Sequence, residues 1–194
     1  VAEGGNLVVT FRSGTKNMDN SMTERTLPGY FKEVAGIELE EFDSLNDCKV
    51  AVEGEFGRGE ASVWADIIKP VTAKPLAVYA GEYYAGKPAV TVNQYGKGRC
   101  FYVGCDLDEA GTEALMDYIA RQCGAAPALE GAPEGVEIVR KVSEKGEEFW
   151  FAMNFSGSEQ TVTFPCALKE IATGEKLGEQ LVLPAYGSAA VARA

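Results

Sequence analysis

The sequence predicts an α/β domain followed by a small antiparallel all-β domain, and three observations lead to this fold class. The first is a strand, a loop and a helix in succession near the N-terminus, which is typical of an α/β unit. The second is the Pro/Gly/Ala-rich stretch GAAPALEGAPEG at residues 124–135, which lacks periodicity and indicates a boundary. The third is that the pattern beyond this boundary is purely strand and turn. We therefore divide the chain into residues 1–126 and residues 127–194.

The first domain is predicted to begin with a strand at residues 6–11. Residues 12–22 are polar and rich in Gly, Asn and Asp, so we expect a loop. Thr26 can cap a short helix over residues 27–35 that stops at Gly36. Further strands are predicted at 37–42, 49–53, 62–66 and 76–79, with a hairpin at 89–94 and 99–104 around the turn 95–98.

A longer helix is predicted over residues 109–123. Its apolar positions Leu115, Ile119 and Cys123 recur every four residues, which places them on one face. Asp108 and Glu109 suit the positive end of the helix dipole, and Gly124 ends the helix.

The second domain is predicted to be a compact antiparallel sandwich. Turn residues such as 144–146, 156–158, 173–174 and 186–187 separate short alternating segments. The six strands are expected at 136–142, 148–155, 160–164, 168–172, 180–183 and 189–192.

Composition excludes several classes of function. The net charge of −11 makes nucleic acid a repulsive partner, and no apolar run is long enough to cross a membrane. The absence of histidine removes Ser-His-Asp and Cys-His catalysis and every His-ligated metal motif. The five cysteines are odd in number and lack C-x-x-C spacing, which favours free thiols in a reducing cytoplasm. The route to hydrolysis that remains is a pair of carboxylates, one acid and one nucleophile or base.

Several motifs have both a functional and a structural interpretation. Asp106, Asp108 and Glu109 could bind a metal or form an acid/base pair, but helix capping is the favoured interpretation. The glycines of residues 54–59 lack the context of a nucleotide loop, so we expect a turn. Residues 12–14 follow a strand end, where a ligand could bind, although a loop that shapes an interface is favoured. Four aromatic side chains could stack on sugars but are expected mainly in the core: Trp64, Tyr83, Tyr84 and Trp150.

An ordered set of segments spans nearly the whole chain and is similar to one known family. The set comprises GGNLVVTFRSGTKNMDN, LPGYFKEVAGIELEEFDSL, NQYGKGRCFYVG and the tail PEGVEIVRK, FWFAMNF, TVTF, TGEKL and LVLPAYGSAAV. In this order they resemble the C-terminal third of bacterial β-galactosidases of glycoside hydrolase family 42. The tail departs from the family pattern at PAYG, where PPYG is expected, and after Asn154, where many relatives have histidine.

The resemblance implies a fold and a function for each part. Residues 1–126 would be a flavodoxin-like (glutamine-amidotransferase-like) α/β trimerisation domain that lacks its opening strand-helix units, and residues 127–194 the C-terminal β-domain. The catalytic Glu pair, of the retaining type, and the galactoside site would lie on a TIM barrel upstream of Val1. Residues 1–5 and the missing initiating Met also fit a piece of a longer polypeptide. The resemblance therefore implies that this chain has no catalytic residue, no cofactor site and no metal site and is inactive alone. The free thiols favour a cytoplasmic location.

The assembly role makes a specific expectation about the contact between subunits. A homotrimer interface needs aromatic or arginine anchors, and the candidates around the first loop and short helix are Arg12, Arg25, Tyr30 and Phe31. Tyr30 and Phe31 could instead simply pack that helix on its own sheet. Two other functions stay open: a stand-alone carbohydrate-binding module in the β-domain, and an amidotransferase-like cysteine enzyme, which the lack of histidine disfavours.

Overall fold

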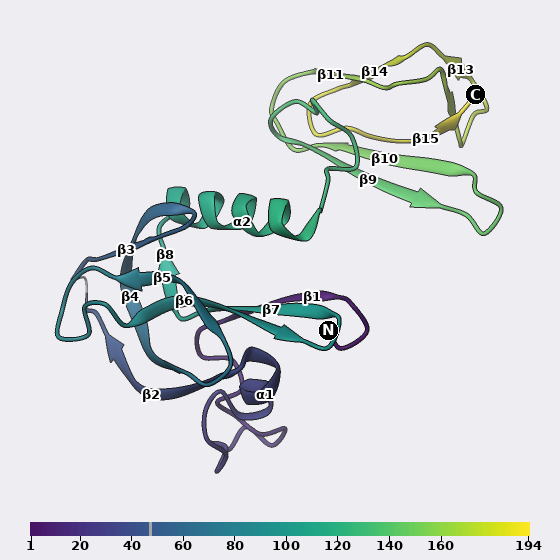
Figure 1. Ribbon diagram of the computed structural model, residues 1–194. Helices are drawn as coiled ribbons and strands as arrows, with labels where there is room; N and C mark the ends of the chain where they lie inside the picture. Colours follow the sequence, from purple (N-terminus) through teal and green to yellow (C-terminus); the bar gives the residue numbers. More distant parts are fainter. Residues whose placement is uncertain (47) are drawn as a thin grey trace. The chain divides into compact units, whose positions relative to one another are not determined.

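The computed structural model describes residues 1–46 and 48–194 and divides into two compact units. Unit 1 comprises Val1–Ala125 and unit 2 comprises Ala126–Ala194 (Figure 1). No helix in the described part of the chain combines the length and apolar character that a membrane crossing requires.

Unit 1 is built on an eight-stranded mixed sheet. Seven strands follow the order β1-β7-β6-β5-β3-β4-β2, and β8 pairs with β4. Only β1 and β7 run parallel among the strand pairs of the described residues in this unit. The strands are β1 (Asn6–Thr10), β2 (Ile37–Ser44), β3 (Val50–Gly54), β4 (Gly57–Pro70), β5 (Lys74–Tyr79), β6 (Pro88–Tyr95), β7 (Gly98–Val103) and β8 (Cys105–Leu107).

This architecture corrects the predicted fold class. A flavodoxin-like α/β domain needs helices between parallel strands, whereas β2 to β7 follow one another without an intervening helix and pair antiparallel. In the described residues of unit 1 the only α-helices are α1 (Lys32–Ala35) and α2 (Glu109–Cys123). The α/β prediction was wrong because one strand-loop-helix pattern near the N-terminus was extended to the whole domain, and the flavodoxin-like fold that the resemblance implied is wrong for the same structural reason.

The two helices lie on opposite faces of the sheet, as Figure 1 shows. Leu115 and Ile119 of α2 pack in one cluster with Phe101 and Val103 of β7. The alternate residues of β7, including Tyr102, point the other way into a second cluster that contains Ala35 of α1. This alternation follows from the two-residue repeat of a strand, and it gives unit 1 an apolar core on both faces.

Helix α2 confirms the prediction for residues 109–123, including its capping. The Asp108 side chain accepts a hydrogen bond from Gly111 N at 3.1 Å, and Gly124 ends the helix in a left-handed conformation. The helix predicted over residues 27–35 is shorter than expected. A 3₁₀ turn covers Gly29–Phe31 before α1, and Thr26 is not the residue that caps either element.

The loop between β1 and the 3₁₀ turn folds back on itself. Thr23 N donates to Thr15 O at 3.0 Å, and Lys16 forms an isolated bridge with Met22. A Cβ atom at position 29 would lie 2.3 Å from the Gly14 carbonyl oxygen. The two backbone segments therefore approach so closely that only glycine fits at position 29. The loop is therefore a compact structure, with its start and end in contact.

Unit 2 consists of strands and turns, and all its strand pairs in the described residues are antiparallel. One sheet has the order β13-β12-β15-β10-β9, and β11 pairs with β14 in a second sheet. Trp150, Phe164, Leu168 and Leu183 form its core, and the buried Asn154 amide donates to three backbone carbonyls. The strands are β9 (Val136–Val142), β10 (Glu148–Asn154), β11 (Gln160–Thr163), β12 (Leu168–Glu170), β13 (Lys176–Leu177), β14 (Gln180–Leu183) and β15 (Ser188–Arg193).

Candidate assembly surface

Three side chains from separate parts of unit 1 form one stack on the surface. The Phe42 and Trp64 rings lie 4.8 Å apart at an interplanar angle of 16°. The Arg12 guanidinium carbon lies 4.8 Å from the centroid of the Trp64 ring. Because Arg12 follows β1 while Phe42 and Trp64 belong to β2 and β4, the stack joins segments far apart in the sequence. We call Arg12, Phe42 and Trp64 the stack.

A bulge in β4 presents Trp64 to the stack, and Asp106 holds that bulge in place. The β4–β8 register shifts between Ala61 and Ala65, so the backbone of residues 62–64 has no pairing partner on the edge of β4 that faces β8. The Asp106 carboxylate accepts hydrogen bonds from the backbone amides of Ser62, Val63 and Trp64 at 3.2, 3.0 and 2.7 Å. One side chain therefore replaces a stretch of strand pairing.

A buried carboxylate lies beneath the stack. Asp66 accepts hydrogen bonds from Trp64 Nε1 at 2.8 Å and from the Tyr102 hydroxyl at 2.7 Å. Burial raises the pKa of the Asp66 carboxyl, while the hydrogen bonds from Trp64 and Tyr102 and the nearby Arg12 act in the opposite direction. Desolvation is the largest of these effects, so this carboxylate is costly to keep charged and needs each of its donors.

A second cation–aromatic pair joins the end of the loop to the 3₁₀ turn. The Arg25 guanidinium carbon lies 4.3 Å from the centroid of the Tyr30 ring, and 68% of Tyr30 is exposed. Phe31 differs, because it is half-buried against the cluster that contains Val9 and Tyr102. Of the four predicted anchors, Arg12, Arg25 and Tyr30 thus reach the surface, and Phe31 mainly packs its own unit.

The other sequence candidates have structural roles. Asp106 and Asp108 bind backbone amides, and the described residues contain no group of three or more acidic or cysteine side chains that could hold a metal ion. Residues 54–59 comprise the end of β3, the turn that follows it and the start of β4. Among the aromatic candidates, Tyr84 and Trp150 are buried, Trp64 is half-buried with two stacking neighbours, and Tyr83 is exposed.

Sequence reasoning missed Phe42 and Asp66. Phe42 stood in the predicted strand at 37–42, and its position among the acidic residues of ELEEFDS was the available signal for an exposed aromatic. Asp66 stood at the end of an apolar strand, and its partners Trp64 and Tyr102 come from β4 and from β7, 36 residues away. The local pattern could not reveal the second partner.

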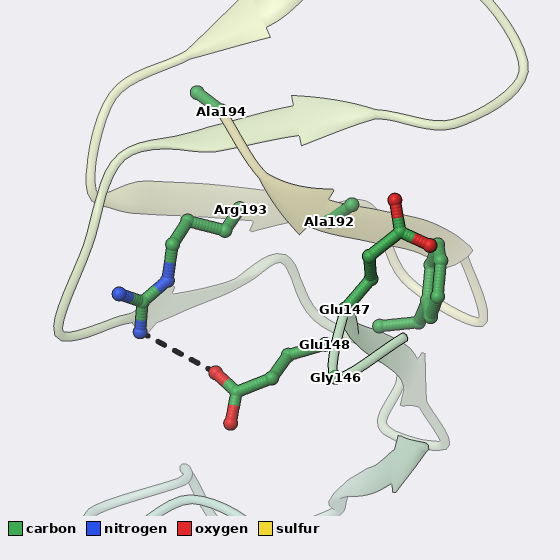
Figure 2. A pocket seen from close by; sticks show the side chains of 7 residues that line it. Gly146, Glu147, Glu148, Ala192, Arg193 and Ala194 are labelled. Carbon is green, nitrogen blue, oxygen red and sulfur yellow. Dashed lines mark hydrogen bonds and ion pairs between the residues drawn. The ribbon is translucent and has the colours of Figure 1, made fainter. Parts of the chain in front are cut away.

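Unit 2 has an open hollow of about 550 Å³ where β10 begins and β15 ends (Figure 2). Glu148 binds Arg193 at 3.3 Å there and also pairs with Arg140. The hydrogen bond from Arg140 is the largest effect that lowers the pKa of Glu148. These side chains are open to solvent and already satisfy one another, so the hollow is an ion-pair cluster at a sheet end and not a formed ligand site.

Comparison with known proteins places both units in one family. The family model described as the β-galactosidase trimerisation domain matches residues 1–125. The chain belongs to glycoside hydrolase family 42. The model of the β-galactosidase C-terminal domain of this family matches residues 135–193.

Curated and solved family 42 relatives cover almost the whole chain. β-Galactosidase LacA of Lactobacillus acidophilus is 38% identical over 180 residues, which cover 91% of this chain and 26% of that protein. β-Galactosidase Pbg of Clostridium perfringens is 32% identical and covers 100% of this chain and 29% of that protein. The chain thus spans between a quarter and a third of the length of these relatives.

Two solved structures agree with the assignment. The crystal structure of β-galactosidase from Bacillus circulans sp. alkalophilus matches with a TM-score of 0.84 at 31% identity, covering 100% of this chain and 30% of that one. The β-galactosidase of Rahnella sp. R3 matches with a TM-score of 0.79 at 33% identity, covering 100% of this chain and 29% of that one. In this family, unit 1 corresponds to the domain named for oligomer assembly.

Proposed function

We propose that this chain is the assembly and C-terminal part of a β-galactosidase and that unit 1 holds its subunits together as a homotrimer. The observation that carries the proposal is the match of residues 1–125 to the family 42 trimerisation domain. Relatives that align over nearly the whole chain are named β-galactosidases, which supports terminal β-galactosides as the substrate of the complete polypeptide. Cytoplasmic location is part of the proposal and is supported by the five unpaired cysteines.

The chemistry of hydrolysis belongs to another part of the polypeptide in this proposal. A glycosidase needs two carboxyl groups that face one substrate, one as acid and one as nucleophile or base. The acidic side chains around the stack have other partners: Asp106 binds amides, Asp66 binds Trp64 and Tyr102, and Asp108 caps α2. The chain supplies assembly and support, and the paired glutamates lie on the catalytic domain.

Two measurements test the proposal. The isolated 194-residue chain should not hydrolyse a chromogenic β-galactoside, and turnover that disappears on substitution of one of its carboxylates would contradict this. Light scattering on the full-length polypeptide should give three times the subunit mass at micromolar concentration. A monomeric full-length protein would remove the assembly role.

A carbohydrate-binding role for unit 2 is the alternative function, and one observation favours it. Phe155 is 62% exposed and Tyr186 is 77% exposed, and both adjoin the turn of residues 156–158. Tyr186 also has a φ of 56°, a conformation that is uncommon for a residue with a side chain. Exposed aromatic rings can stack on sugars. Calorimetric titration of the chain with galactose and lactose, beside a Tyr186→Ala variant, tests this role, and equal heats for both proteins would exclude it.

A further inference from the structure

The stack is held in one arrangement by groups beneath and beside it. Asp106 fixes the backbone of residues 62–64, and Asp66 holds the Trp64 indole through its Nε1. Phe42 is 55% exposed, and Arg12 is also exposed, so these supports act on side chains that face solvent. Side chains fixed before binding lose little entropy when they enter a contact.

The backbone at Arg12 supplies an independent indication of function. Its φ is 62°, in the left-handed region where a residue with a side chain is strained. Strained backbone of this kind is concentrated at functional positions. Here the strained conformation accompanies the placement of the guanidinium over the Trp64 ring.

We propose that the stack, together with the Arg25–Tyr30 pair at the far end of the loop that begins at Arg12, is one half of a heterologous contact with a second copy of the chain, and that an acidic surface of that copy forms the other half. This inference rests on the assembly role proposed above. It adds the location of the contact and the chemistry of the surface that receives it.

The composition of this surface matches the centre of a protein interface. Aromatic residues, methionine and arginine are enriched in interface cores, and tryptophan, tyrosine and arginine dominate binding energies. The stack and the Arg25–Tyr30 pair contain these residue types, and the loop adds the exposed Met18 and Met22.

Charge identifies the partner surface. The chain carries a net charge of −11, yet residues 12–28 hold three cations against two anions. Among the described residues, neither Arg12 nor Arg25 forms an ion pair, so both guanidinium groups keep free donors. A second copy of so acidic a chain offers carboxylates to these donors.

The symmetry of a trimer agrees with this pairing. A three-membered ring is closed by heterologous contacts, in which one patch meets a different patch of the next subunit. A surface with two unpaired arginines would repel itself across a two-fold axis, whereas it attracts an acidic surface. The stack is therefore suited to a ring and poorly suited to a symmetric dimer.

The test uses the full-length polypeptide and matched pairs of substitutions. Phe42→Ser and Arg12→Glu change the stack. Tyr83→Ser is the aromatic control. Tyr83 is 69% exposed and packs on Tyr84, and Tyr84 belongs to the core cluster on the other face of the sheet. Arg58→Glu reverses an exposed charge at the β3–β4 turn. Analytical ultracentrifugation gives the association constant of each variant, and circular dichroism verifies folding.

We expect the two stack variants to associate at least about tenfold more weakly than the wild type and the two controls to associate like it. Added salt should weaken the wild type more than Arg12→Glu, because the contact includes that charge. Amide hydrogen exchange in the wild type, compared between dilute and concentrated samples, should slow in residues 12–28 on association, a result that needs no substitution.

Three other outcomes would overturn the inference. Folded stack variants that associate like the wild type would overturn the inference and leave the assembly role standing. Equal weakening by Tyr83→Ser would also overturn it, because the contact would not be specific to this face. A wild type that is monomeric at every concentration would overturn the assembly role together with the inference.

Discussion

Replacing Asp106 by alanine is predicted to destabilise unit 1, because one carboxylate serves three consecutive amides of β4. The amides of Ser62 and Trp64 are partly buried, whereas that of Val63 is exposed and can turn to water. A hydrogen bond to a charged group contributes about 1.5–3 kcal/mol, and solvent access reduces this to roughly 1–1.5 kcal/mol for each of the two partly buried amides. The expected loss is therefore about 2–3 kcal/mol.

Differential scanning calorimetry can measure this loss. A change of that size corresponds to a fall in Tm of roughly 8–12 °C for a unit of this length. Asp106→Asn keeps an acceptor oxygen but not its charge, so it should lose about half as much. Glu109→Ala, at an exposed position in the first turn of α2, is the control and should change Tm by no more than about 2 °C. A loss below about 0.5 kcal/mol for Asp106→Ala would refute the reasoning, because water would then replace the carboxylate at the bulge.

Three further predictions concern pH, backbone strain and the boundary between the units. Burial raises the pKa of Asp66 above its ordinary value of 3.8, so the folded state favours the protonated carboxyl. The contribution of Asp66 to the free energy of unfolding is therefore fully present below pH 3.8 and is lost as pH rises through the folded-state pKa. Urea titrations should therefore show Asp66→Asn gaining stability relative to the wild type between pH 4 and pH 7, and a difference that did not change with pH would contradict this. Gly29→Ala should cost about 2 kcal/mol in chemical unfolding, more than Gly86→Ala, because both have positive φ but only Gly29 lacks space for a side chain. Limited proteolysis should cut first within residues 125–133, and an initial cut within residues 148–164 would argue against two separately folded units.

The elements that sequence reasoning predicted well depend on local signals. Helix α2 follows from the spacing of Leu115 and Ile119 and from Asp108 and Gly124 at its ends, all within one segment. The β6–β7 hairpin follows similarly from two apolar segments around a glycine-containing turn.

The elements that were missed depend on partners far away in the sequence. Strand β4 was predicted at residues 62–66 and extends over 14 residues, because β2 pairs with its C-terminal half and β3 with its N-terminal half. Its bulge exists because Asp106, more than 40 residues later, satisfies the free amides. Such pairings also decide whether a sheet is parallel, and this is why the flavodoxin-like expectation failed.

Of the candidate surface, the loop could be predicted but the stack could not. Arg12, Arg25 and Tyr30 lie in or beside a polar loop that composition alone reveals. The position of Trp64 beside Arg12 depends on long-range pairing: β1 pairs with β7, and β8, which follows β7 in the chain, pairs with β4. Residue type therefore suggested the anchors, and only the fold brought Arg12 to Trp64 and Phe42.

The distribution of the two tryptophans gives each unit its own intrinsic fluorophore. Trp64 belongs to unit 1 and is half-buried beside a cation, whereas Trp150 is buried in the core of unit 2 next to Phe164. Emission from a Trp150→Phe protein would report on unit 1 alone, and emission from a Trp64→Phe protein on unit 2 alone. Unfolding curves of the two single-tryptophan proteins would separate the stabilities of the units within one intact chain, and a shift of the Trp64 spectrum on subunit association would record the event at the stack itself.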